Sequence, residues 1–199
     1  MKIDALQSRF PRLVWPLALL ILSCPLAGAD EVWEDISASW LQSAAPTRIA
    51  FVPGEPEWIL LCTYGQGILY SRTGAETWSR VYHDLCYGEP CMGVIVNDLL
   101  FNPGSPHQGV ALTMDGSFWT DDGGAHWDPS SGSGDPLWGY MAVSTPDVQT
   151  AIASGLLGRM WTYDWSNRLW QEPIEVHYGQ ALLGLAFAHG PSPVLFVGS

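Results

Sequence analysis

Positive charge is scarce in this sequence. Its 199 residues include 8 Lys and Arg against 20 Asp and Glu, which gives a formal net charge of −12. A surface of this sign repels nucleic-acid phosphates and anionic lipid headgroups, so the sequence predicts neither as a main partner. Phosphate-binding loops, serine-nucleophile motifs and clusters with metal-ligand spacing are also missing, so we expect no cofactor and no metal site.

A membrane-spanning apolar run is missing as well. The N-terminal run Leu13–Ser23 falls short of the ~20 residues that a spanning helix needs, and it contains Pro16. Three basic residues precede it and a small-residue cleavage motif comes after it: Lys2, Arg9 and Arg12, then Ala27-Gly28-Ala29. This pattern is typical of a signal peptide over residues 1–29, cut after Ala29. We therefore expect a secreted or periplasmic mature chain without a transmembrane segment; a lipoprotein acylated at Cys24 is the alternative.

Cysteines are few. Three remain after residue 29, namely Cys62, Cys86 and Cys91. Export makes oxidation possible, and Cys86 and Cys91 close a short loop in which Gly88 and Pro90 supply the turn. We therefore predict a disulfide between Cys86 and Cys91, while Cys62 lies in a predicted inner strand and is expected to be a buried free thiol.

The sequence does contain a repeat. Three segments that begin with a glycine and end with a tryptophan resemble one another, with the tryptophans 49 and 43 residues apart and the glycines 49 and 42 apart. The segments are Gly67–Trp78, Gly116–Trp127 and Gly158–Trp170. A period of roughly 40–50 residues is typical of propeller blades.

Each repeat also predicts four short strands. An apolar strand and a proline turn precede a second apolar run, and the glycine-to-tryptophan segment supplies the last two strands. Four antiparallel strands in a radially repeated unit form the blade of a β-propeller, so the expected fold class is all-β. The blades are predicted over approximately residues 47–82, 97–131 and 140–174, and a two-stranded hairpin is predicted over 185–199.

The N-terminus of the mature chain matches the end of a repeat. Trp33-Glu34-Asp35-Ile36 is similar to the closing tryptophan of each repeat together with the residues directly after it, so a fourth blade strand is expected over residues 32–39. It would complete the last blade and close the ring. Because propellers have four to eight blades, the sequence predicts the front part of a larger, here incomplete, propeller in residues 30–199.

The most complete copy of the motif reads Thr120-x-Asp122-Gly123-Gly124-x-His126-Trp127. It resembles the Asp box, or BNR repeat, of sialidases, sortilin-type receptors, xyloglucan-cleaving glycosidases and photosystem II assembly factors. The resemblance covers residues 49–199 and implies an exported bacterial Asp-box propeller. The other two copies have lost parts of the motif, and their matching positions are Ser71, Gly74 and Trp78, then Thr162, Asp164 and Trp170.

The residue types of the box favour a structural role. We expect it to join the third and fourth strands of a blade, where Gly123 and Gly124 supply the positive φ angles of a tight turn. Thr120 and Asp122 can bond to turn backbone groups, and Trp127 packs inside or between blades. A calcium loop is the alternative, but the alternating oxygen ligands and the distal glutamate are missing.

Strand alternation assigns the connections to two faces. The proline turns and the boxes lie on one face of the propeller. The loops between the second and third strands of each blade lie on the other face, together with the blade-to-blade connections. We expect binding residues on this second face. Its aromatic rings, carboxylates and amides suit a sugar or an extended peptide. The candidate ligand contacts are Tyr64, Gln66, Asp115, Tyr82, His83, Glu89, Trp138, Tyr140, His177 and Tyr178. The alternative is that they only pack blade edges and loops.

No catalytic signature stands out. Glycoside hydrolysis needs two carboxylates about 5–10 Å apart, and the spacing of Asp84, Glu89 and Asp115 selects no pair. We therefore predict an exported, non-catalytic propeller segment that binds a protein or a carbohydrate. The N-terminal part of a sialidase-like or xyloglucanase-like glycoside hydrolase is the alternative, and an assembly factor for an exported membrane complex is a third hypothesis.

Overall fold

The computed structural model describes residues 45–86, 94–130, 139–145, 147, 149–176, 179–188 and 193–199. The chain divides into two units, Met1–Asp35 and Ile36–Ser199, and every described residue belongs to the second. The signal peptide and the strand predicted over residues 32–39 therefore lie outside the described residues.

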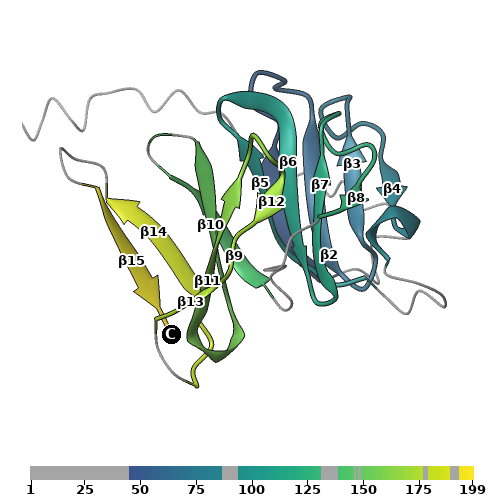
Figure 1. Ribbon diagram of the computed structural model, residues 1–199. Coiled ribbons are helices and arrows are strands. Elements are labelled where there is room, and N and C mark those ends of the chain that lie inside the picture. The colour runs from purple at the N-terminus through teal and green to yellow at the C-terminus, as the bar shows by residue number, and fades with distance from the viewer. Residues whose placement is uncertain are drawn as a thin grey trace, which may run out of the picture. The chain divides into compact units, whose positions relative to one another are not determined.

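The described residues form successive antiparallel sheets of short strands (Figure 1). The first has the order β1-β2-β3-β4 and the second β5-β6-β7-β8. The first four strands are β1 Ala45–Phe51, β2 Ile59–Tyr64, β3 Ile68–Ser71 and β4 Ser79–Val81. The next four are β5 Val96–Asn102, β6 Ser105–Thr113, β7 Gly116–Thr120 and β8 Asp128–Pro129. Each strand pairs with the next one in the chain, which is the meander expected of a blade.

The third sheet keeps the same order but divides its outer strand. Its strands are β9 Gly139–Ser144, β10 Thr150–Gly155, β11 Arg159–Asp164 and β12 Leu169–Trp170, with β13 Ile174–Glu175. Both β12 and β13 pair with β11, at its opposite ends. A two-stranded sheet of β14 Gly184–Ala188 and β15 Val194–Gly198 comes next in the chain. The predicted all-β propeller class is confirmed.

Two short 3₁₀ turns lie between strands of the described residues, His83–Leu85 and Leu156–Gly158. The first belongs to the connection after the first blade, which carries the candidate contacts Tyr82 and His83. Leu85 is fully buried at its end.

Two apolar clusters lie where neighbouring sheets pack face to face. One joins the first and second sheets and includes Leu60, Cys62, Phe118 and Trp127. The other joins the second and third sheets through residues such as Leu112 and Trp161. A sheet that is apolar on its inner faces must bury them against another layer, so each blade depends on its neighbours.

Polar contacts also connect the first strands of the three blades. Thr47 Oγ1 donates to the Val96 carbonyl at 2.5 Å, and Asn97 Nδ2 donates to the Gly139 carbonyl at 2.7 Å. Asp98 accepts the Ala142 N–H at 2.9 Å and pairs with Arg48 at 3.1 Å. Side chains from β1 and β5 thus join three blades in sequence.

In the part of the chain that the structure describes, no helix has the length and apolar character needed to cross a bilayer.

Candidate functional site

The hairpin between the third and fourth strands of a blade, here called the box hairpin, is held by side-chain contacts to its own backbone. In the second blade, Thr120 Oγ1 donates to Asp122 Oδ1 at 2.9 Å and accepts the Gly124 N–H at 3.1 Å. Asp122 Oδ1 also accepts the N–H groups of Ala125 and His126 at 2.9 and 3.1 Å. The polar atoms of this hairpin are therefore engaged in the turn itself.

The two degenerate copies preserve this arrangement with other atoms. In the first blade, Ser71 Oγ accepts the Ala75 N–H at 2.9 Å and Thr73 Oγ1 accepts the Thr77 N–H at 2.9 Å, so a hydroxyl replaces the carboxylate. In the third blade, Asp164 Oδ1 accepts the N–H groups of residues 166 and 167 at 2.8 and 3.1 Å. The same backbone-capping turn is therefore present in the two copies that have lost residues of the motif.

Positive φ angles mark the same hairpins. Gly123 and Gly124 adopt φ values of 76° and 93°, but Ala75 and Arg168 reach 75° and 57° without being glycine. Non-glycine residues have a steric penalty in this region. The degenerate copies therefore retain the required backbone at some cost in stability.

Two of the closing tryptophans, Trp127 and Trp170, pack against the preceding blade. Trp127 is 3% exposed in the cluster with Leu60, and its Nε1 donates to the Gly124 carbonyl at 3.0 Å. Trp170 Nε1 donates to Ser117 Oγ at 2.6 Å. Trp78 is half-buried, and its Nε1 has no acceptor within the described part of the chain.

Three of the predicted ligand contacts come together beside the first blade. Arg80 Nη1 donates to Gln66 Oε1 at 2.8 Å and lies 5.2 Å from the ring centre of Tyr82, which meets His83 edge-on at 5.6 Å. An open pocket of about 220 Å³ adjoins this group and includes Asp84. The pocket is lined by Arg80, Tyr82 and His83 but not by Gln66, and Ala125 of the second box hairpin also borders it.

The other predicted contacts do not join this group. Tyr64 is 60% exposed and forms an isolated bridge to Ile95, Asp115 is exposed in the β6–β7 turn, and Tyr140 is half-buried on β9. Four further candidates lie outside the described residues, namely Glu89, Trp138, His177 and Tyr178.

The cysteines lie in two different environments. Cys62 is a free thiol with no exposed surface, as the sequence predicted, and burial raises its pKa well above the ordinary thiol value. Cys86 takes part in a disulfide. Its predicted partner Cys91 lies outside the described residues, so that pairing stays a prediction.

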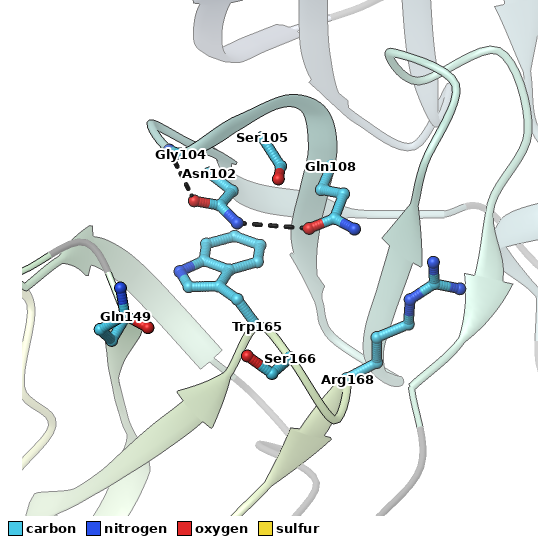
Figure 2. Close-up of a pocket in the computed structure, with 8 residues that line it drawn as sticks. All are labelled: Asn102, Gly104, Ser105, Gln108, Gln149, Trp165, Ser166 and Arg168. Carbon is cyan, nitrogen blue, oxygen red and sulfur yellow. Dashed lines mark hydrogen bonds between the residues drawn. The ribbon is translucent and has the colours of Figure 1, made fainter.

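A polar pocket that the sequence did not indicate opens on the opposite face, between the second and third blades (Figure 2). It has a volume of about 330 Å³ and is built by the β5–β6 turn, the residue before β10 and the third box hairpin. Its lining residues are Asn102, Gly104, Ser105, Gln108, Gln149, Trp165, Ser166 and Arg168. We call it the amide pocket.

Hydrogen bonds fix one wall of the amide pocket (Figure 2). Asn102 Oδ1 accepts the Gly104 N–H at 2.9 Å, and Asn102 Nδ2 donates to Gln108 Oε1 at 3.2 Å. Asn102 is only 5% exposed. The turn is therefore held in place, and the Asn102 contact occupies the carbonyl oxygen of the Gln108 amide.

Arg168, the one cation among the described lining residues of the amide pocket, is compensated by two contacts. Arg168 Nη2 lies 3.2 Å from Asp121 Oδ2, and its guanidinium lies 4.0 Å from the ring centre of Trp119. A cation over an indole face is attracted by the ring quadrupole. These two contacts connect the second and third box hairpins and hold Arg168 at the pocket wall.

An apolar groove of about 420 Å³ lies on the other side of the same β5–β6 turn. Pro53 and Pro106 contribute its apolar surface, and it shares Ser105 and Gln108 with the amide pocket. Beside it, His107 stacks on Trp58 with ring centres 5.3 Å apart, so this groove lies between the first and second blades.

In the residues that the structure describes, no group of three or more His, Cys, Asp and Glu side chains is placed to hold a metal ion.

No family model and no curated protein matches this sequence. Solved structures do match it. YCF48 bound to D1 peptide aligns with a TM-score of 0.55 at 17% identity, over 84% of this chain and 52% of that one. A GH74 xyloglucanase from Xanthomonas campestris aligns with a TM-score of 0.54 at 16% identity, over 76% and 28%.

The extracellular domain assigned to a hybrid two-component system of B. thetaiotaomicron aligns with a TM-score of 0.52 at 14% identity, over 71% of this chain and 19% of that one. The chain thus spans between about a fifth and about half of the solved chains it matches. At these identities the likeness defines the class of protein, a β-propeller, and nothing finer.

Proposed function

We propose that this chain is an exported, non-catalytic Asp-box propeller segment that binds a protein or a glycan. The box hairpins support the Asp-box assignment, because all three form a backbone-capping turn in which an aspartate or hydroxyl accepts N–H groups. These hairpins are structural, and the binding function belongs to the pockets between them.

The lining of the amide pocket carries the proposal. Its described residues offer carboxamides, hydroxyls, an indole and one compensated guanidinium, and no carboxylate is among them. Hydrolysis of a glycosidic bond needs an acid and a nucleophile or base, both carboxyl groups in most enzymes. A pocket with this lining can recognise hydrogen-bonding groups without cleaving them.

The structural neighbours agree with either ligand class. One is YCF48 in complex with a D1 peptide, and another is a GH74 xyloglucanase. Both align with the propeller sheets of this chain, and a fold of this kind accommodates many functions in its loops. The ligand of this chain must therefore be argued from its own residues.

A glycoside hydrolase segment is the second candidate, favoured by the GH74 xyloglucanase neighbour. Asp84 beside the small pocket of the first blade and Asp115 in the β6–β7 turn are the exposed carboxylates that it would use. Reducing-sugar release from soluble polysaccharides tests this candidate. Release that disappears in Asp84→Asn or Asp115→Asn would replace the binding proposal by an enzymatic one.

Binding itself is tested with the full-length protein, purified after export, on glycan and peptide arrays. We expect a saturable signal on one of them and no bond cleavage. Absence of any signal on both arrays would contradict the proposal. N-terminal sequencing of the same sample should begin at Asp30, the residue after the predicted cleavage site.

A further inference from the structure

We propose that the amide pocket is a subsite for a neutral saccharide. This inference rests on the binding function proposed above and names its ligand class and location. The pocket lies between two blades, on the face opposite to the one that the sequence favours for ligands (Figure 2). Its volume of about 330 Å³ falls in the range of small-molecule sites, about 300–1,000 Å³.

The charge of the pocket excludes most ionic ligands. Arg168 is its only charged lining residue among those described, and this cation is paired with Asp121 at 3.2 Å. The whole chain carries a net charge of −12, so an acidic sugar or acidic peptide is repelled at long range. A cationic ligand would need an unpaired carboxylate, and none belongs to the described lining.

The donors and acceptors of the pocket match hydroxyl groups. Each sugar hydroxyl donates one hydrogen bond and accepts others, so its site must offer both roles. A carboxamide has both on neighbouring atoms, and Gln108, Gln149 and Ser166 all present such mixed groups. Gln149 and Ser166 are exposed, and neither side chain is used in a turn contact among the described residues.

Trp165 provides an independent sign of a missing partner. Its side chain is 5% exposed, it lines the amide pocket, and its Nε1 has no acceptor among the described residues. Figure 2 shows the indole below Asn102 and Gln108, with its nitrogen on the Gln149 side. Buried indole N–H groups usually have a partner. This nitrogen has almost no accessible surface, so a sugar oxygen in the pocket reaches it only after a small rotation of the indole, and we assign that oxygen as the partner.

An extended peptide fits this pocket less well than a sugar. Peptides that add to a sheet use the unpaired backbone of an edge strand, but the pocket is walled by side chains of two turns and a hairpin. An apolar peptide side chain would bury the amides of Gln108 and Gln149 without partners, which opposes binding. A ring of hydroxyl groups satisfies the same amides.

The test is a titration of the full-length protein with cellotetraose, mannotetraose and tetra-N-acetylchitotetraose, monitored through the indole N–H resonances in NMR. One of these neutral sugars should bind and shift the Trp165 N–H signal, which Trp165→Phe identifies by its loss. Gln149→Ala should weaken binding about tenfold, which corresponds to one neutral hydrogen bond. Gln171→Ala, the same change at an exposed glutamine that lines neither the amide pocket nor the small pocket of the first blade, should change it by less than about twofold.

The outcomes separate this inference from the function on which it rests. If Gln66→Ala in the first blade abolishes sugar binding and Gln149→Ala leaves it intact, the proposed binding function stands, but the amide pocket is not the binding site. If the protein binds on the peptide array and none of the three sugars has an effect, the binding function stands, but its ligand is not a neutral saccharide. If neither the arrays nor the titration show binding, the proposed binding function itself is wrong. Because Gln149 is exposed, its variant remains informative if Trp165→Phe fails to fold.

Discussion

Arg48 Nε lies 3.1 Å from Asp98 Oδ1, and this ion pair joins the first strand of one blade to the first strand of the next. Asp98 is 2% exposed, whereas about half of the Arg48 side chain reaches solvent. Asp98 also accepts the N–H groups of Leu99 at 2.8 Å and Ala142 at 2.9 Å. One carboxylate thus connects three blades.

Removal of this carboxylate should destabilise the protein strongly. Asp98→Ala leaves two buried N–H groups and a guanidinium without their acceptor, so we expect a loss of about 2–4 kcal/mol in the free energy of unfolding. Asp98→Asn keeps one acceptor oxygen and should cost less. Urea unfolding at neutral pH measures both, and equal stability of Asp98→Ala and the parent protein would contradict the assignment.

The same residue gives a pH dependence of known sign. Burial raises the pKa of the Asp98 carboxyl above its usual range, although the Ala142 N–H and Arg48 act in the other direction. The folded state therefore binds this proton more tightly than the unfolded state, and its contribution to stability grows as the pH falls through the folded pKa. The parent protein should gain stability relative to Asp98→Asn between neutral pH and about pH 4. If the stability of the parent protein relative to Asp98→Asn fell on acidification, the pKa of Asp98 in the folded state would be lowered instead of raised.

Trp127→Ala should cost far more than Asp121→Ala. Trp127 is 3% exposed between two blades, and its truncation leaves a large cavity that costs about 3–5 kcal/mol. Asp121 is exposed and holds Arg168 in a surface ion pair, which is worth up to about 1 kcal/mol. Similar urea midpoints for the two variants would place Trp127 outside the core.

Two glycines of the box hairpins form a matched pair. Gly74 and Gly124 have φ values of +62° and +93°, so alanine is strained at both. A Cβ at Gly74 meets nothing, but at Gly124 it collides with the Leu60 side chain of the preceding blade. Gly74→Ala should cost about 1–2 kcal/mol from backbone strain, and Gly124→Ala distinctly more. Thermal unfolding of both variants checks the order, and a more damaging Gly74→Ala would refute this packing.

His126 should titrate above its ordinary range. The hydrogen bond and the charge of Asp122, whose Oδ2 lies 2.6 Å from Nδ1, raise the pKa of this imidazole above 6.5. Asp122 responds in the opposite direction: partial burial opposes its ionisation, but the bonds from His126, Thr120 and Ala125 keep its pKa below the usual range. The contact therefore stabilises the hairpin below about pH 6.5 and is lost as the pH rises through the raised pKa of His126. NMR titration should show the imidazole pKa returning to about 6.5 in Asp122→Asn.

Thiol counting provides a chemical check. Cys62 is buried and free, and Cys86 is disulfide-bonded. If the chain is exported and cut after Ala29 as proposed, the purified protein should show one free thiol that reacts only after denaturation. Two thiols that react in the native state would exclude the predicted bridge between Cys86 and Cys91.

The blade pattern could be predicted from the sequence because each strand and turn is local. The repeat of apolar strands, proline turns and closing tryptophans determines the meander, and the observed β5–β8 occur in that order. The box hairpin of the second blade could likewise be inferred from Thr120, Asp122 and two glycines. The turn at His83–Leu85 was missed, because the inward placement of Leu85 depends on contacts with the next blade.

The amide pocket could not be predicted in the same way. Asn102, Gln149 and Arg168 come from non-equivalent positions of two repeats, and they meet only once the second and third blades are packed. A repeat alignment emphasises the residues that the copies share, whereas this pocket is built from residues that they do not share. Sequence reasoning therefore chose the face with the longer loops and overlooked the one where neighbouring hairpins converge.

The contacts between blades join positions about one repeat apart. Arg48 and Asp98 are separated by 50 residues, Asp98 and Ala142 by 44, and Asp121 and Arg168 by 47. In these three pairs the second blade supplies the acceptor toward both neighbours, Asp98 for Arg48 and Ala142, and Asp121 for Arg168. Its two sides therefore need donors from different blades, so the blades are not interchangeable. Duplication or loss of one whole blade beside it would separate these partners and alter the amide pocket at the same time.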